Sequence, residues 1–224
     1  MIWIHGGLHK TGSSAIQNYL ETHSRSFRYD PQARYWLSRP EVPYSHLRYL
    51  KNRGRRGSVV ISSEWLLGSP DNGYKSACQR VRKVASQLEG EDWKIILYFR
   101  PQIDWFESLY SQKIKTGSVL APSHFVHQVG EQAGLEWGQL VKRLASEFGS
   151  QRFAIRCYRS EDLMEDFCRV TKQSVGGDPY RRVNERISCR EILIQREFNL
   201  YIKDSGCANK RDLCRAAYGL LPQI

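Results

Sequence analysis

Short apolar runs of strand length alternate along this chain with segments of helical periodicity, and this alternation restricts the fold more than any other feature. Three such runs extend from Ile2 to His5, from Ser58 to Ser62 and from Trp93 to Phe99, and we expect a fourth strand from Phe153 to Tyr158. The third run is almost continuously apolar, as parallel strands buried on both faces are. The alternation predicts an α/β fold of three layers, α/β/α, with right-handed crossovers and helices on both faces of a central parallel sheet.

The length and composition of the chain fit one folded unit. A chain of 224 residues with a hydrophobic fraction of 41% can form one core, so we expect a single domain over residues 1–224. Two interpretations stay open for the irregular segment from Asp30 to Arg56, which is either a substrate-facing insertion or a solvated connection. The expected helices are Ser13 to Thr22, Tyr74 to Leu88, Ile103 to Lys115, Trp137 to Phe148, Glu161 to Val170, Arg190 to Ile202 and Lys210 to Tyr218.

The charge of the chain is strongly positive. The net charge of +11 arises from Lys and Arg residues spread along the sequence and predicts an anionic partner. Signatures of zinc fingers, basic zippers and RRM domains are missing, and aromatic residues do not recur within a basic stretch, so we do not expect nucleic acid as the partner. A small polyanionic nucleotide, with or without an acidic polymer, explains the charge equally well.

Other compositional features bear on location and redox state. The sequence has no apolar run long enough for a bilayer span, and the first apolar stretch stops at His5, so we expect a cytoplasmic protein without a signal peptide or transmembrane segment. We expect little before the first strand, whereas the apolar end 220–224 leaves a truncated C-terminus open. The six cysteines form no CxxC pair and no zinc-ligand pattern, which favours reduced thiols, although Cys207 and Cys214 could pair.

The segment after the first strand has the composition of an anion-binding loop. Gly6, Gly7 and Gly12 flank the pair Lys10-Thr11, and the next helix opens with Ser13-Ser14. Glycines allow successive N–H groups to point inward, the helix N-terminus adds partial positive charge, and the lysine adds a full charge. A capped strand-to-helix turn with an incidental lysine is the alternative interpretation.

The order of residues in this loop differs from Walker A. In that motif, GxxxxGK followed by Ser or Thr, the lysine comes after the last glycine, whereas here Lys10 precedes Gly12 in the order GxxKTGSS. No expected strand ends in the aspartate that a Walker B magnesium site needs. A P-loop kinase using ATP and magnesium is therefore less favoured, but it stays the enzymatic alternative.

Two further residues are expected at the same edge of the sheet. Arg100 follows the third strand and Ser108 lies eight residues later in a helix, so both could bind one phosphate, with the arginine making a bidentate contact. A solvated arginine and an ordinary helix serine would show the same spacing. In this helix we expect Pro101 in the first turn and a core stripe in which Tyr110 packs rather than reacts; the stripe comprises Ile103, Phe106, Leu109, Tyr110 and Ile114.

A carboxylate follows the second strand. Glu64 should emerge at the edge where the first loop lies, which makes it a candidate general base. Beside Lys10 a carboxylate tends to stay ionised, so partial burial would be needed to raise its basicity. Pairing with a surface arginine, or capping of the next helix, is the alternative role.

The first loop resembles that of the PAPS-dependent sulfotransferases, which carry GxxKxG followed by two Ser or Thr residues and have a P-loop kinase-like fold. In that family the loop binds the 5′-phosphosulfate of 3′-phosphoadenosine 5′-phosphosulfate (PAPS). The resemblance implies that Lys10 contacts the bridging oxygen. It also implies that the group is bound by Lys10, Thr11, Gly12, Ser13 and Ser14.

The same resemblance assigns roles to the other candidates. The Arg100 and Ser108 pair is similar to the family's 3′-phosphate signature, and Glu64 matches the general base of its glycan-modifying branch. The small-molecule branch uses a His base, which makes His5 and His9 rivals; otherwise they pack or contact phosphate, and His9 is counted among the cofactor-binding candidates.

The resemblance implies in-line transfer of a sulfuryl group without a metal. The segments Ser-Ser-Glu and Arg-Pro-Gln-Ile-Asp-Trp resemble the sequences of bacterial members that act on carbohydrate or lipopolysaccharide hydroxyls, so we expect such an acceptor. The match is firm over about 120 residues. In the rest of the chain the match is loose. Arg182 and Asn184 therefore have two open interpretations: contact with the nucleotide, or a place in a solvated basic turn. A non-catalytic protein that binds nucleotides or polyanions is the alternative outside the enzymes.

Overall fold

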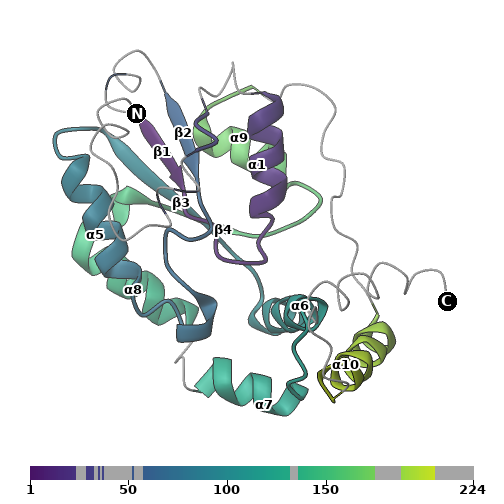
Figure 1. Cartoon of the computed structure of the whole chain (residues 1–224). Helices are drawn as coiled ribbons and strands as arrows, with labels where there is room; N and C mark the ends of the chain where they lie inside the picture. Colours follow the sequence, from purple (N-terminus) through teal and green to yellow (C-terminus); the bar gives the residue numbers. More distant parts are fainter. Residues whose placement is uncertain are drawn as a thin grey trace.

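Four parallel strands form the centre of the molecule (Figure 1). The computed structural model describes residues 1–23, 29–32, 35, 37, 52, 58–131, 136–174 and 188–204. Within them the sheet order is β2-β1-β3-β4, and His5 at the end of β1 lies opposite Ser62 of β2 and Ile96 of β3. The strands are β1 (Ile2–His5), β2 (Val59–Ser62), β3 (Trp93–Phe99) and β4 (Phe153–Cys157).

Alternate side chains of the strands pack into two separate cores. Ile2 and Ile4 of β1 face one core, and Trp3 between them faces the other, as the two-residue repeat of a strand requires. Figure 1 shows α5 and α8 on one side of the sheet and α1 and α9 on the other. The three-layer α/β/α prediction is therefore confirmed. The covering helices are α1 (Ser13–Thr22), α5 (Ala77–Gln87), α8 (Trp137–Phe148) and α9 (Leu163–Thr171).

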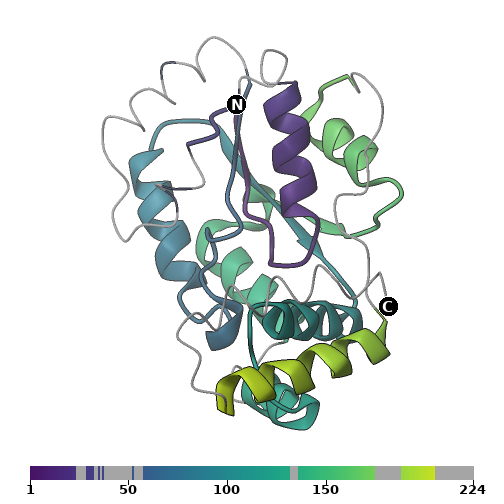
Figure 2. The ribbon, with the colours of Figure 1, turned by 45° about the vertical axis from the view of Figure 1, so that its right-hand side comes forward.

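Three further helices lie below the carboxyl ends of the strands in the view of Figure 1. Figure 2 shows α10 running beside α6, and Asn199 joins them by donating to the carbonyls of Ile114 (2.8 Å) and Ser118 (2.9 Å). These helices are α6 (Gln102–Lys115), α7 (Pro122–Val126) and α10 (Cys189–Asp204). Short helical turns cover Pro70–Asn72 (η1), His127–Glu131 (η2) and Ser150–Arg152 (η3).

Most element boundaries agree with the periodicity of the sequence. The first strand and the helices α1 and α8 have the expected bounds. The helix expected from Tyr74 begins at Ala77, because Tyr74 has a left-handed backbone (φ 56°) that a helix does not accommodate. The following expectations lie outside the described residues: the helix at 210–218, the loop with Arg182 and Asn184, the Cys207 and Cys214 pair, the end 220–224 and nearly all of 30–56.

The expected core stripe of α6 is wrong at one position. Ile103 is 83% exposed, whereas Trp105, which was not assigned to the stripe, is 0% exposed. Two residues correspond to a turn of about 200° around a helix, so these side chains point in opposite directions. Tyr110 packs as expected, with its hydroxyl donating to the carbonyl of Leu120 (2.9 Å).

Two findings concern membranes and thiols. In the ranges given above, no helix combines the length and the apolar character needed to cross a bilayer. Four cysteines are described, and each is a free thiol: Cys78, Cys157, Cys168 and Cys189.

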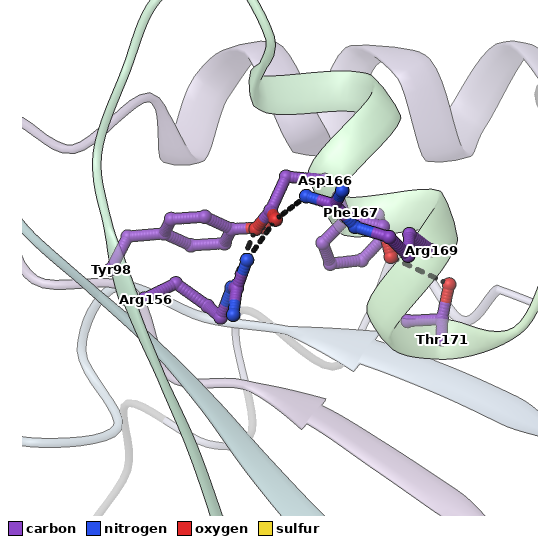
Figure 3. Close-up of polar contacts among 6 residues, drawn as sticks. All are labelled: Tyr98, Arg156, Asp166, Phe167, Arg169 and Thr171. Carbon is purple, nitrogen blue, oxygen red and sulfur yellow. Dashed lines mark hydrogen bonds and ion pairs between the residues drawn. The ribbon is translucent and has the colours of Figure 1, made fainter.

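A buried carboxylate joins α9 to the sheet (Figure 3). Asp166 accepts hydrogen bonds from the Tyr98 hydroxyl (3.0 Å) and from Arg156 Nε (2.9 Å), and it forms an ion pair with Arg169 (2.5 Å). Burial alone would raise the pKa of Asp166, but the hydrogen bonds from Arg156, Arg169 and Tyr98 outweigh burial and lower the pKa to about 2. The charged carboxylate therefore stabilises the contact between α9, β3 and β4.

We expect Asp166→Asn to reduce the free energy of unfolding by about 2 kcal/mol, because it removes the charge that accepts from the buried Tyr98 hydroxyl and from the partly exposed Arg156. The ordinary pKa of Asp is about 3.9. Since the folded pKa is lower, the stabilisation is complete above this value and is lost as the pH falls toward 2. Urea unfolding at pH 7 and pH 3 measures both effects. The exposed neighbour Glu165 provides a control, Glu165→Gln, and equal losses in the two variants would contradict this role of Asp166.

Candidate functional site

The loop between β1 and α1 has two residues in the left-handed region. Lys10 has φ 66° and Gly12, the N-cap of α1, has φ 79°. A Cβ on residue 12 would lie 2.4 Å from Leu163 Cδ2 and 2.9 Å from Tyr158 Cε2, so only glycine fits. No side chain caps the first turn of α1, and the buried hydroxyl of Ser13 has no hydrogen-bond partner among the described residues. The helix start thus offers N–H and O–H donors to an anion.

Aromatic side chains from other elements hold this loop. Trp105 Nε1 of α6 donates to the carbonyl of His9 (2.7 Å), and the hydroxyl of Tyr74 accepts from the backbone N–H of His9 (3.2 Å). Thr11 Oγ1 donates to the carbonyl of Leu8 (2.5 Å). The sequence analysis missed Trp105 and Tyr74, because no spacing relates either residue to the loop. The polar atoms on these aromatic side chains were the available signal, since such atoms need partners when buried.

The two histidines of this region are buried and neutral. Burial lowers the pKa of His5 to about 3 and that of His9 to about 4. The His5 ring contacts Tyr98, and the His9 ring lies edge-on to Trp65 with centroids 4.8 Å apart. Both rings therefore pack against aromatic side chains, and a contact of His9 with the nucleotide stays a prediction.

Lys10 and Glu64 lie close enough for their charges to interact. Burial lowers the pKa of Lys10, the charge of Lys115 lowers it further, and Glu64 acts in the opposite sense. Burial raises the pKa of Glu64, and Lys10 partly offsets this effect. Glu64 is therefore partly buried, as the sequence analysis required for this carboxylate to be more basic beside a lysine. The third charge near Lys10 is Arg100, which also lowers the pKa of the lysine.

Arg100 is held from two sides. Its carbonyl accepts from Trp137 Nε1 of α8 (3.1 Å), and its guanidinium carbon lies 5.6 Å from the centre of the Tyr158 ring. Because Tyr158 also packs against Gly12, one aromatic ring connects Arg100 with the first loop. Trp137 was not anticipated as a site residue, because only the fold brings its helix to this edge. Tyr158 is the last residue of the expected fourth strand but was given no role at the site.

The structure brings some predicted site residues together and leaves others apart. The charges of Glu64 and Arg100 both act on Lys10, and the three residues follow strands at the carboxyl edge of the sheet, where open α/β folds bind ligands. Ser14 is exposed on the first turn of α1, and Ser108 is half-buried on α6. No contact between Ser108 and Arg100 is found among the described residues, so their shared phosphate stays a prediction.

The chemistry available at this edge combines anion binding with a base. Lys10, Arg100 and Lys115 supply positive charge, and Glu64 supplies a carboxylate of raised pKa. In the described part of the chain, no group of three or more His, Cys, Asp or Glu side chains could hold a metal ion. The arrangement can bind an anionic ligand and accept a proton beside it.

Comparison with known proteins identifies the fold. No protein-family model and no curated protein sequence matches this chain. Among solved structures, a sulfotransferase from Alicyclobacillus acidocaldarius is similar, with a TM-score of 0.54, 18% sequence identity, and coverage of 96% of this chain and 97% of that one. At this identity the similarity concerns the fold, which is the P-loop kinase-like fold of a sulfotransferase.

We expect Trp105→Phe to lower the free energy of unfolding by about 2 kcal/mol, because it leaves the buried carbonyl of His9 without its donor. Ile103→Ala on the same helix is the matched control, since Ile103 is exposed and should change stability by less than about 0.5 kcal/mol. Urea unfolding of both variants measures the difference. A Trp105→Phe protein as stable as the control would show that the hydrogen bond is not needed to hold the loop.

Proposed function

We propose that this chain is a PAPS-dependent sulfotransferase acting on a hydroxyl of a carbohydrate or lipopolysaccharide-type acceptor. The observation that carries the proposal is that the charges of Arg100 and Glu64 both act on Lys10, in the loop that leads into α1. The similarity of the fold to a solved sulfotransferase supports it. The resemblance of the segments Ser-Ser-Glu and Arg-Pro-Gln-Ile-Asp-Trp to those of bacterial members with such acceptors supports the choice of acceptor.

The first loop binds the phosphosulfate in this proposal. Lys10 contacts the bridging oxygen, while Thr11, Gly12, Ser13 and Ser14 surround the group with backbone and hydroxyl donors. The unpartnered, buried hydroxyl of Ser13 fits this role, because a ligand oxygen would satisfy it. His9 completes the set of nucleotide contacts, since its Nε2 is likewise buried without a partner in the described part of the chain.

Arg100 and Ser108 bind the 3′-phosphate of the nucleotide. The guanidinium of Arg100 is oriented over Tyr158, and its backbone is fixed by Trp137, so the charge is held near the loop. A fixed arginine binds phosphate well because less side-chain freedom is lost on binding. Ser108 reaches the same group from α6.

The reaction is the in-line displacement of PAP, adenosine 3′,5′-bisphosphate, from sulfur. The acceptor oxygen forms a new S–O bond as the bond to the bridging oxygen breaks, and that electron pair stays on the 5′-phosphate of PAP. Glu64 takes the proton of the acceptor hydroxyl, and Lys10 stabilises the charge that develops on the leaving oxygen. The raised pKa of Glu64 supports its role as a base.

An ATP-dependent P-loop kinase is the enzymatic alternative. Its magnesium site requires an aspartate after a strand. None of the four described strands is followed by an aspartate: the residues after β1, β3 and β4 are Gly6, Arg100 and Tyr158, and β2 leads through Ser63 to Glu64. These residues favour the sulfotransferase proposal.

Calorimetry with PAP, ADP and ATP tests the choice of nucleotide. We expect PAP to bind at least about tenfold more tightly than ADP, because a charge-assisted contact with the 3′-phosphate contributes this much. Arg100→Ala should remove most of that preference, while Arg143→Ala, on the exposed surface of α8, should not. Equal affinities for PAP and ADP, with Arg100→Ala affecting both alike, would refute PAPS as donor. Magnesium-dependent ATP binding would favour the kinase.

A second test concerns Glu64. We expect Glu64→Gln to bind PAP normally but to reduce kcat by at least about a hundredfold, because the base is lost. In the unaltered protein kcat/KM should rise with pH as Glu64 loses its proton, with a midpoint above the ordinary Glu value of about 4.3, since burial raises its pKa. Glu165→Gln, at an exposed position of α9, is the control and should leave kcat unchanged. Unchanged turnover of Glu64→Gln would remove Glu64 from the mechanism, and no turnover by the unaltered protein would favour a non-catalytic binding protein.

A further inference from the structure

A chain of polar side chains lies beneath the start of α1. His5 of β1 and Ser62 of β2 are opposite each other in the sheet, and His5 Nδ1 lies 2.8 Å from Ser62 Oγ. Gln17 Nε2 donates to the same Ser62 Oγ at 3.4 Å. Since Gln17 lies four residues after Ser13, both side chains are on one face of α1.

The contacts of Ser62 favour a hydrogen on Nε2 of His5. Ser62 Oγ accepts from Gln17 with one lone pair, and His5 Nδ1 is the acceptor that the described residues offer to the Ser62 O–H group. A neutral imidazole whose Nδ1 accepts must carry its hydrogen on Nε2. Burial, which lowers the pKa of His5 to about 3, keeps the ring neutral, and the edge-on rings of Tyr98 and Phe167 hold its plane.

His5 Nε2 and the hydroxyl of Ser13 both lie beside Gly7. A Cβ on residue 7 would lie 2.9 Å from His5 Nε2 and 2.3 Å from Ser13 Oγ, so both atoms border the small space that glycine leaves open. Both are buried, and neither has a hydrogen-bond partner among the described residues. Buried polar groups without partners are uncommon and call for a role.

We propose that His5 is a positioning residue that acts through Ser13. When an anion occupies the loop, His5 Nε2–H donates to Ser13 Oγ, and the hydroxyl proton of Ser13 then points at a ligand oxygen. Ser62, which accepts from Gln17, favours the tautomer of His5 that this contact needs. The inference rests on the proposed function, because it requires the phosphate or phosphosulfate of a nucleotide in this loop.

Two substitutions of His5 separate its nitrogens. The amide oxygen of asparagine can lie near the position of Nδ1 and accept from Ser62, so His5→Asn can keep this contact but lacks a donor toward Ser13. The amide nitrogen of glutamine lies near the position of Nε2, so His5→Gln keeps that donor. We expect PAP to bind about fivefold more weakly to His5→Asn, and to His5→Gln within about twofold of the unaltered protein.

The double variant tests whether His5 acts through Ser13. Once Ser13→Ala has removed the hydroxyl, adding His5→Asn should weaken PAP binding no further, because the interaction is already lost. A purely structural role of His5 would instead add its full effect in both backgrounds. Calorimetry with PAP measures the four affinities, and thermal unfolding checks that each variant is folded.

Nitrogen NMR of the unaltered protein labelled with 15N-histidine provides a measurement that needs no variant. We expect the spectrum of His5 to show hydrogen on Nε2 and a bare Nδ1, and the opposite tautomer would overturn the inference. If His5→Asn binds PAP as tightly as the unaltered protein does, the inference about His5 is overturned, but the proposed function is not. If the unaltered protein does not bind PAP, the proposed function fails, and the inference fails with it.

Discussion

The hydrogen bond from Trp105 Nε1 to the carbonyl of His9 is the contact on which the arrangement of the site depends. The loop after β1 is almost wholly buried, and buried backbone groups must find partners inside the protein. Trp105 belongs to α6, which begins just after Arg100, and its ring lies edge-on to that of Trp137 at 5.1 Å. Because Trp137 Nε1 donates to the Arg100 carbonyl, the two indole rings connect the loop with the arginine backbone.

The charged groups at the sheet edge shift one another's pKa values. Positive neighbours and burial both make the protonated form of Lys10 less stable, whereas Glu64 makes it more stable. For Glu64 the balance is reversed, since burial favours its neutral form and Lys10 favours its ionised form. An anionic ligand would offset the repulsion among the cations. A site with this balance is suited to bind an anion and to accept a proton beside it, which are the two tasks in the proposed sulfuryl transfer.

Two polar clusters lie on the same side of the sheet, beneath α1 and α9. Tyr98 belongs to the Asp166 cluster and its ring also contacts His5, which belongs to the polar chain under the loop. The sheet therefore supports the site in two ways. It aligns the strand ends that Lys10, Glu64 and Arg100 follow, and it holds the His5 ring in the plane that the proposed contact with Ser13 requires.

The sequence by itself determined the layers and the four strands, because two-residue and helical periodicities are local properties. It also indicated Lys10, Glu64 and Arg100 as candidate site residues, because parallel strands end at one edge of the sheet. It could not decide between Ile103 and Trp105 at the start of α6, since both are apolar and only packing against the loop distinguishes them. Tertiary structure alone brought Trp137 and Lys115 to the edge. It also decided the neutral state of His5, because burial and long-range hydrogen bonds depend on residues far apart in the chain.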